Sequence, residues 1–164
     1  MEGKPDKFYH ASLNKEIEEL EPRRLSNRSK EEGKLLFASP DIACATMFLV
    51  RIYDNESRKG YSNGAYYFVI ANKEKFLELD KGGIVYVLPD ANFTCDPNKW
   101  QKEWATTEKV KPESKIHFDS ALKAMIENGV KVYFVDKEKF ETEIKDKRIT
   151  TDYLEGTLGL TAEK

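Results

Sequence analysis

Aromatic and β-branched residues gather in short runs between polar turns, a pattern typical of β-strands. The run at 84–88 (IVYVL) ends at Pro89, because proline donates no hydrogen bond to a neighbouring strand. All the runs with this character are predicted to be strands: 7–12 (KFYHAS), 34–39 (KLLFAS), 65–71 (AYYFVIA), 84–88, 104–107, 115–118 and 130–135 (VKVYFV).

Helix signals occur at three places. Residues 39–41 (SPD) offer a capping hydroxyl, a proline suited to the first turn and an acid at the positive end of the helix dipole, and apolar residues continue to Val50. Ser120 begins a second helix, which the Asn128-Gly129 pair closes. A charged amphipathic helix is expected at 137–147.

Turn residues mark three further segments. The polar stretch from Asp54 to Gly64 is predicted to be a loop that could act as a lid. The run 76–90 (FLELDKGGIVYVLPD) is predicted to be a hairpin with Asp80 as an ordinary turn residue. The segment 150–164 is expected to be either a docked turn of helix or a frayed end.

Strands and helices do not alternate regularly in this order, and no internal repeat is visible, which favours an α+β fold over a doubly wound sheet. The 164 residues match the size of one domain. We therefore expect a single α+β domain over 1–149, with a mixed, mostly antiparallel sheet and flanking helices, followed by the C-terminal segment 150–164.

Charge and composition set limits on partners and location. The chain has 27 Lys and Arg against 29 Asp and Glu, so its net charge of -2 provides no global field for a nucleic-acid backbone or an anionic membrane. No apolar stretch approaches the ~18 residues that span a bilayer, and the N-terminus lacks the pattern of a leader. A cytoplasmic protein without a membrane or strong nucleic-acid signal is expected.

Common catalytic motifs are missing from the sequence: it contains no P-loop, dinucleotide-binding glycine fingerprint, HExxH or GxSxG. The two histidines, His10 and His117, are too few for most catalytic zinc sites, so no metal is expected. His10 ends an apolar strand and precedes the small residues Ala11 and Ser12, where a ligand can approach the backbone. The alternative is a structural histidine at a strand end. His117 alternates with apolar neighbours and is predicted to point outward.

Three segments together resemble the ADP-ribosyltransferase superfamily. YHAS at 9–12 is similar to the family's opening YHGT or YHGS, and LLFASPDIACATMF at 35–48 to its strand, turn and alanine-containing helix. KEWATTEKVKPESKI at 102–116 is similar to the late strand that carries the family's acidic residue. The resemblance implies a split-sheet fold, NAD as the bound nucleotide and no metal cofactor.

The resemblance also implies roles for individual residues. His10 matches the histidine that hydrogen-bonds the adenosine ribose of NAD, and Ser12 the small hydroxyl residue beside it. Glu103 matches the acid, whose carboxylate would stabilise the positive charge that develops on the sugar when nicotinamide leaves. Glu108 is a nearby competitor for that role.

Two positions depart from the family pattern. Ala11 replaces the usual glycine, and Phe37 or Ser39 occupies the second-motif position, where many members have tyrosine. Tyr66 or Tyr67 is a possible source of the ring that stacks on nicotinamide.

Two functions of different classes remain open at this point. One is an enzyme that transfers ADP-ribose from NAD to an unidentified acceptor, or hydrolyses NAD. The other is a noncatalytic interaction module of the same fold or of an unrelated α+β fold.

Overall fold

A computed structural model describes residues 4–25, 33–53, 55–95 and 103–164. By its internal contacts the chain divides into two compact units, each described by itself below. The first unit comprises Met1–Ala45 and Gly83–His117, and the second comprises Thr46–Gly82 and Phe118–Lys164. The α+β class with mostly antiparallel sheets is confirmed. The extent of one domain over 1–149 stays a prediction.

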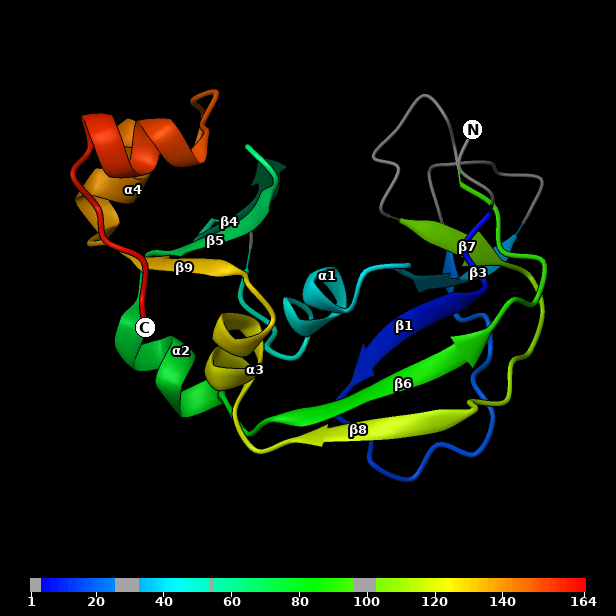
Figure 1. Cartoon of the computed structure of the whole chain (residues 1–164). Coiled ribbons are helices and arrows are strands. Elements are labelled where there is room, and N and C mark those ends of the chain that lie inside the picture. Colours follow the sequence, from blue (N-terminus) through cyan, green and yellow to red (C-terminus); the bar gives the residue numbers. More distant parts are fainter. Residues whose placement is uncertain (1–3, 26–32, 54, 96–102) are drawn as a thin grey trace. The chain divides into compact units, whose positions relative to one another are not determined.

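The first unit contains two small sheets (Figure 1). One has the order β1-β6-β8, and the other has the order β2-β3-β7. The ladders β1–β6, β2–β3 and β3–β7 are antiparallel. The bounds are β1 Lys7–Ser12, β2 Arg24–Leu25, β3 Lys34–Ala38, β6 Gly83–Pro89, β7 Trp104–Thr106 and β8 Ser114–Phe118, and the short helix α1 spans Ile42–Thr46.

An apolar core joins these strands. Phe8 on β1 is fully buried, and its ring stacks on Phe93 with centroids 4.4 Å apart and lies 5.5 Å from the ring of Trp104 on β7. Leu36 and Tyr86 belong to the same buried cluster. Because each large buried side chain contributes about 1.5–3 kcal/mol, this cluster holds β1, β3, β6 and β7 together.

The second unit is built on a sheet of order β4-β5-β9, in which β4 is antiparallel and β9 parallel to β5. Asn63 and Gly64 connect β4 to β5, and both have positive φ, as a tight hairpin turn requires. The bounds are β4 Ser57–Ser62, β5 Ala65–Ile70, α2 Lys73–Leu79, α3 Ala121–Glu127, β9 Lys131–Phe134, α4 Lys137–Glu143 and the π-helix η1 Tyr153–Thr157.

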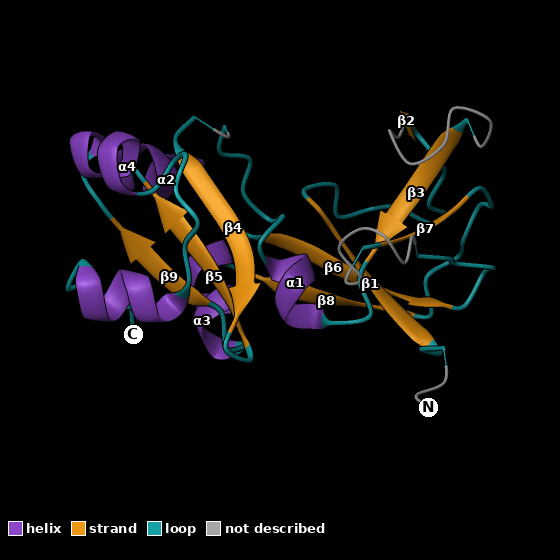
Figure 2. Cartoon of the chain, turned by 90° about the horizontal axis from the view of Figure 1, so that it is seen from above, coloured by secondary structure: helices purple, strands orange, loops and turns teal. Residues whose placement is uncertain are grey.

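Helices cover this sheet (Figures 1 and 2). Tyr67 and Val69 on β5 pack in one cluster with Phe140 of α4 and Leu154 of η1. Phe68 points to the opposite face, where its ring lies 6.4 Å from that of Phe76 on α2. Alternate residues of β5 are therefore buried on both faces, which explains its unbroken apolar run.

The start of α3 depends on residues that precede β6. The Asp80 carboxylate accepts the backbone N–H groups of Ala121 at 2.6 Å and Leu122 at 3.0 Å, and the Ser120 hydroxyl at 3.0 Å. Gly82 has φ +67°, and a Cβ there would stand 2.1 Å from the Phe118 carbonyl oxygen. Asp80 is thus a helix cap, and only glycine fits at position 82.

The strand predictions at 7–12, 34–39, 65–71, 84–88, 104–107, 115–118 and 130–135 are confirmed within one or two residues at each end, as is the helix that begins after Ser120.

Four predictions are wrong. The first helix ends at Thr46, because the chain turns at once after α1, and the helix expected at 137–147 ends at Glu143. The predicted loop from Asp54 to Gly64 contains β4, which pairs with β5 along its whole length, so its described part is not a lid; Asp54 lies outside the described residues. The predicted hairpin at 76–90 begins instead with α2, which Asn72 caps.

The C-terminal segment 150–164 is docked on the second unit. Leu154 is fully buried, and the N–H of Glu163 donates to the Val132 carbonyl of β9 at 2.8 Å. Within the part of the chain that the structure describes, no helix is long and apolar enough to cross a membrane.

Candidate functional site

The strands β1 and β3 meet at a single backbone pair. The N–H of Tyr9 donates to the Ser39 carbonyl at 2.7 Å, and the N–H of Ser39 donates to the Tyr9 carbonyl at 3.0 Å. A continued antiparallel ladder would next pair Ala11 with Phe37. Instead, the Phe37 carbonyl oxygen lies 2.7 Å from Nδ1 of the His10 ring. We call the residues at this meeting point, Tyr9 to Ser12 and Phe37 to Ser39, the β1–β3 junction.

The partner of His10 determines its tautomer. A carbonyl oxygen can only accept, so Nδ1 carries the proton. In the neutral ring Nε2 is then an acceptor. The half-buried ring is held in one orientation by the Phe37 carbonyl. His10 therefore presents an acceptor nitrogen of fixed direction, which suits a hydroxyl donor.

The chain leaving β1 is fixed by a series of turns. The Ser12 hydroxyl accepts the N–H of Asn14 at 3.1 Å, and the Asn14 side chain accepts the N–H of Glu16 at 3.0 Å. Tyr86 lies opposite His10 on β6, and its hydroxyl donates to the Asn14 carbonyl at 2.6 Å and accepts from the N–H of Ile17 at 3.1 Å. These bonds give the segment beside Ser12 a defined path.

Ser39 and Phe37 form the other side of the junction. Ser39 is buried, and its hydroxyl accepts the N–H of Asp41 at 3.1 Å. The Asp41 carboxylate accepts the N–H of Ala43 at 3.0 Å in the first turn of α1. Phe37 is half-buried and stands opposite Ala105 of β7. Ser39 thus joins β1 to the helix start, as the sequence predicted for its capping role.

Glu103 stands one residue before β7 and is exposed. Ala38 pairs with Trp104, so the same register continued by one residue sets Glu103 opposite Ser39. Since Ser39 pairs with Tyr9, Glu103 is two strand spacings, about 10 Å, across from β1. Trp104 packs into the core, and successive side chains alternate, so Glu103 follows the opposite face from Trp104.

The competitor Glu108 lies beyond the other end of β7. Its carboxylate accepts a hydrogen bond from the Asn92 side chain, and its N–H donates to the Thr106 hydroxyl at 3.2 Å. The Ser39 end of β7 carries Glu103 and not Glu108, because the ladder runs from Trp104 to Thr106.

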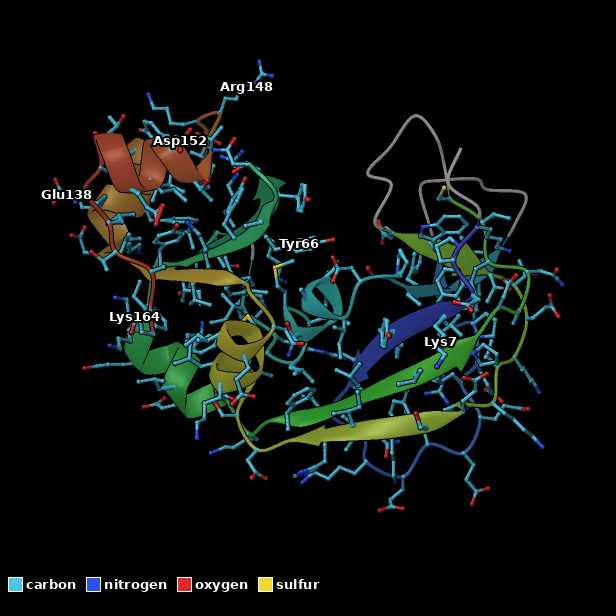
Figure 3. The ribbon with its side chains drawn as sticks, viewed as in Figure 1. Lys7, Tyr66, Glu138, Arg148, Asp152 and Lys164 are labelled. Atoms are coloured by element: carbon cyan, nitrogen blue, oxygen red, sulfur yellow. The ribbon has the colours of Figure 1, made fainter. Side chains whose placement is uncertain are left out.

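Tyr66 and Tyr67 belong to β5 of the second unit (Figure 3 labels Tyr66). Both are buried. The Tyr66 ring meets the Tyr61 ring edge-on at 4.8 Å, and the Tyr67 ring lies against Gly60. Burial raises the pKa of the Tyr67 hydroxyl, and the Arg58 guanidinium lowers it in part. Both rings pack within their own unit, so we build the candidate site from first-unit residues alone.

The remaining candidate residues have structural surroundings. His117 is exposed on β8, as predicted. Within residues 4–25, 33–53, 55–95 and 103–164, no group of three or more His, Cys, Asp or Glu side chains could hold a metal ion.

Sequence reasoning missed Tyr86 at this site. Its only signal is a hydroxyl-bearing residue inside the aliphatic run IVYVL. Comparison with known proteins adds no assignment: no family model, no curated protein and no solved structure matches this chain.

Proposed function

We propose that this protein binds NAD at the β1–β3 junction and cleaves the bond between nicotinamide and ribose, passing ADP-ribose to an acceptor or to water. One observation carries the proposal. The three segments that resemble ADP-ribosyltransferases are far apart in the sequence, yet they are joined in space: Tyr9 pairs with Ser39, and Ala38 pairs with Trp104. A chance likeness of short motifs would not require the three to be neighbours.

In this proposal His10 positions the cofactor. Its Nδ1 proton is engaged by the Phe37 carbonyl, so Nε2 accepts a hydroxyl of the adenosine ribose. A ring fixed in this way contributes by orienting the substrate, not by transferring a proton.

Glu103 supplies the carboxylate in the proposed reaction. When the glycosidic C–N bond breaks, its electron pair leaves with nicotinamide and the ribose becomes oxocarbenium-like. A nearby carboxylate stabilises that charge, and the hydroxyl of the acceptor or of water then bonds to the sugar and loses its proton. The exposed Glu103 carboxylate follows the face of Ser39, about 10 Å across the strands from β1, so an extended dinucleotide would contact both sides of the junction.

One observation favours a noncatalytic binding module as the second candidate. The hydroxyl oxygens of Ser12 and Ser39 both accept backbone N–H groups in local turns. Phe37 or Ser39 stands where many family members have tyrosine. A module of this kind would keep NAD binding and lack the cleavage step.

Nicotinamide release from NAD, followed by chromatography, tests the proposal. Glu103→Gln is expected to slow release at least about 100-fold, as for a lost electrostatic contact to the transition state. Glu108→Gln is the matched control and should release nicotinamide at the wild-type rate. Equal rates for wild type and Glu103→Gln would remove Glu103 from the mechanism. NAD binding without release by the wild type would establish the noncatalytic candidate.

A further inference from the structure

The second unit exposes aromatic rings close together in the sequence. Phe48 is 47% exposed, Tyr53 70% and Tyr61 45%. Tyr61 and Lys59 are two residues apart on β4, so both side chains lie on the face of β4 that also carries Phe68 and Tyr66 of β5. We call Phe48, Tyr53, Lys59, Tyr61 and Lys75 the β4 stripe. Exposed rings of this size mark an interaction surface more often than isolated aliphatic residues do.

Two ammonium groups of the β4 stripe lie on its rings. The Lys59 Nζ is 4.5 Å from the centre of the Phe48 ring and 5.0 Å from that of Phe68, so it lies between an exposed ring and a buried one. The Lys75 Nζ is 4.9 Å from the Tyr53 ring and 2.8 Å from the Glu56 carboxylate. Lys59 is therefore the main source of positive charge in the stripe, because Glu56 offsets Lys75.

We infer that the β4 stripe binds single-stranded nucleic acid. The stripe repeats an aromatic ring beside an ammonium group, and a nucleic-acid strand repeats an aromatic base beside a phosphate. Bases stack on exposed aromatic side chains whatever their sequence, because every base has a π-face. A duplex hides those faces in its own stack, so it fits the stripe poorly. A protein partner would favour a continuous apolar surface, whereas ammonium groups interrupt this one.

The charges predict how this binding responds to salt. With a net charge of -2 for the chain, long-range attraction cannot supply the affinity. A single phosphate contact from Lys59 gives a slope of log affinity against log salt of about -0.7. Raising the salt about fourfold should therefore weaken binding only about 2.6-fold. Each stacked ring, by contrast, should contribute about fivefold or more.

Fluorescence anisotropy on the full chain tests the inference, with labelled oligothymidylate of about 12 nucleotides as the probe. Saturable binding that weakens about 2.6-fold between about 50 and 200 mM salt is expected. Tyr53→Ala should weaken it about fivefold or more, and Tyr53 is exposed enough that folding does not depend on it. Phe48→Ala should do the same, with circular dichroism to verify its fold. Leu77→Ala, 47% exposed on α2, is the matched control and should bind as the wild type does.

Three results would overturn the inference: no saturable binding at about 1 mM protein, far weaker than stacked rings predict; equal affinity for a duplex of the same length; or unchanged binding by Tyr53→Ala. None of these depends on NAD, so they leave the proposed function untouched.

Discussion

The orientation of His10 predicts a preference for NAD over NADP. In the proposal, Nε2 accepts a hydroxyl of the adenosine ribose because Nδ1 donates to the Phe37 carbonyl at 2.7 Å. NADP carries a phosphate in place of one ribose hydroxyl, so an acceptor would face an acceptor. A buried or half-buried group left without its hydrogen bond costs about 1–3 kcal/mol. NADP should therefore bind about 5- to 150-fold more weakly than NAD.

Isothermal titration calorimetry at about pH 8, where imidazoles are neutral, measures this preference. His10→Ala should reduce the affinity for NAD and remove most of the difference between the two nucleotides. The variant also loses the bond to Phe37, so its free energy of unfolding should fall by about 0.5–1.5 kcal/mol. His117→Ala is the control, since His117 is exposed on β8. Equal affinity of the wild type for NAD and NADP, or a preference that survives His10→Ala, would refute the reasoning.

Three further predictions concern stability. Gly82→Ala should destabilise the protein by more than about 2 kcal/mol, because it adds a backbone clash to the strain of a positive φ, whereas Gly129→Ala, with open space around it, should lose about 1 kcal/mol. Asp80→Asn should cost about 1–3 kcal/mol, since an amide nitrogen cannot accept the N–H groups that start α3. The hydrogen bond from Lys4 lowers the pKa of Asp90, so this pair stabilises above the unfolded pKa of about 3.9 and the contribution is lost as pH falls through and below that value. Asp90 is largely exposed, which limits the effect to under about 0.5 kcal/mol.

Urea unfolding measures all three. Equal losses for Gly82→Ala and Gly129→Ala, or no loss for Asp80→Asn, would contradict the first two. An Asp90→Asn variant should differ from the wild type more at about pH 7 than at about pH 3, and the opposite order would contradict the third.

Strands with strong local signals could be predicted from the sequence, and segments that depend on their neighbours could not. The β4 sequence SRKGYS has few strand formers, but pairing with β5 makes it a strand, and Gly60 leaves room for the Tyr67 ring. In α2 only Phe76 is buried, so an apolar period was hardly visible. Tertiary contacts overrode local propensity in both segments.

The candidate site was predictable to a similar degree. His10 stood out because small residues follow a strand, but the Phe37 carbonyl that fixes its ring is a backbone atom and leaves no trace in the sequence. The same holds for Tyr86, whose contact with Asn14 spans 72 positions. Tyr66 and Tyr67 were grouped with the site by residue type alone, and contacts assign them to the second unit.

The central claim is that His10, held by the Phe37 carbonyl, contacts bound NAD. Because the chain has only 2 histidines, the spectrum of ¹⁵N-labelled imidazoles contains just His10 and His117, and His117→Ala assigns them. The account predicts that His10 carries its proton on Nδ1 in the free protein and that its Nε2 signal shifts on addition of NAD, while His117 stays unchanged. A proton on Nε2, or no shift of His10 with NAD in large excess, would contradict it.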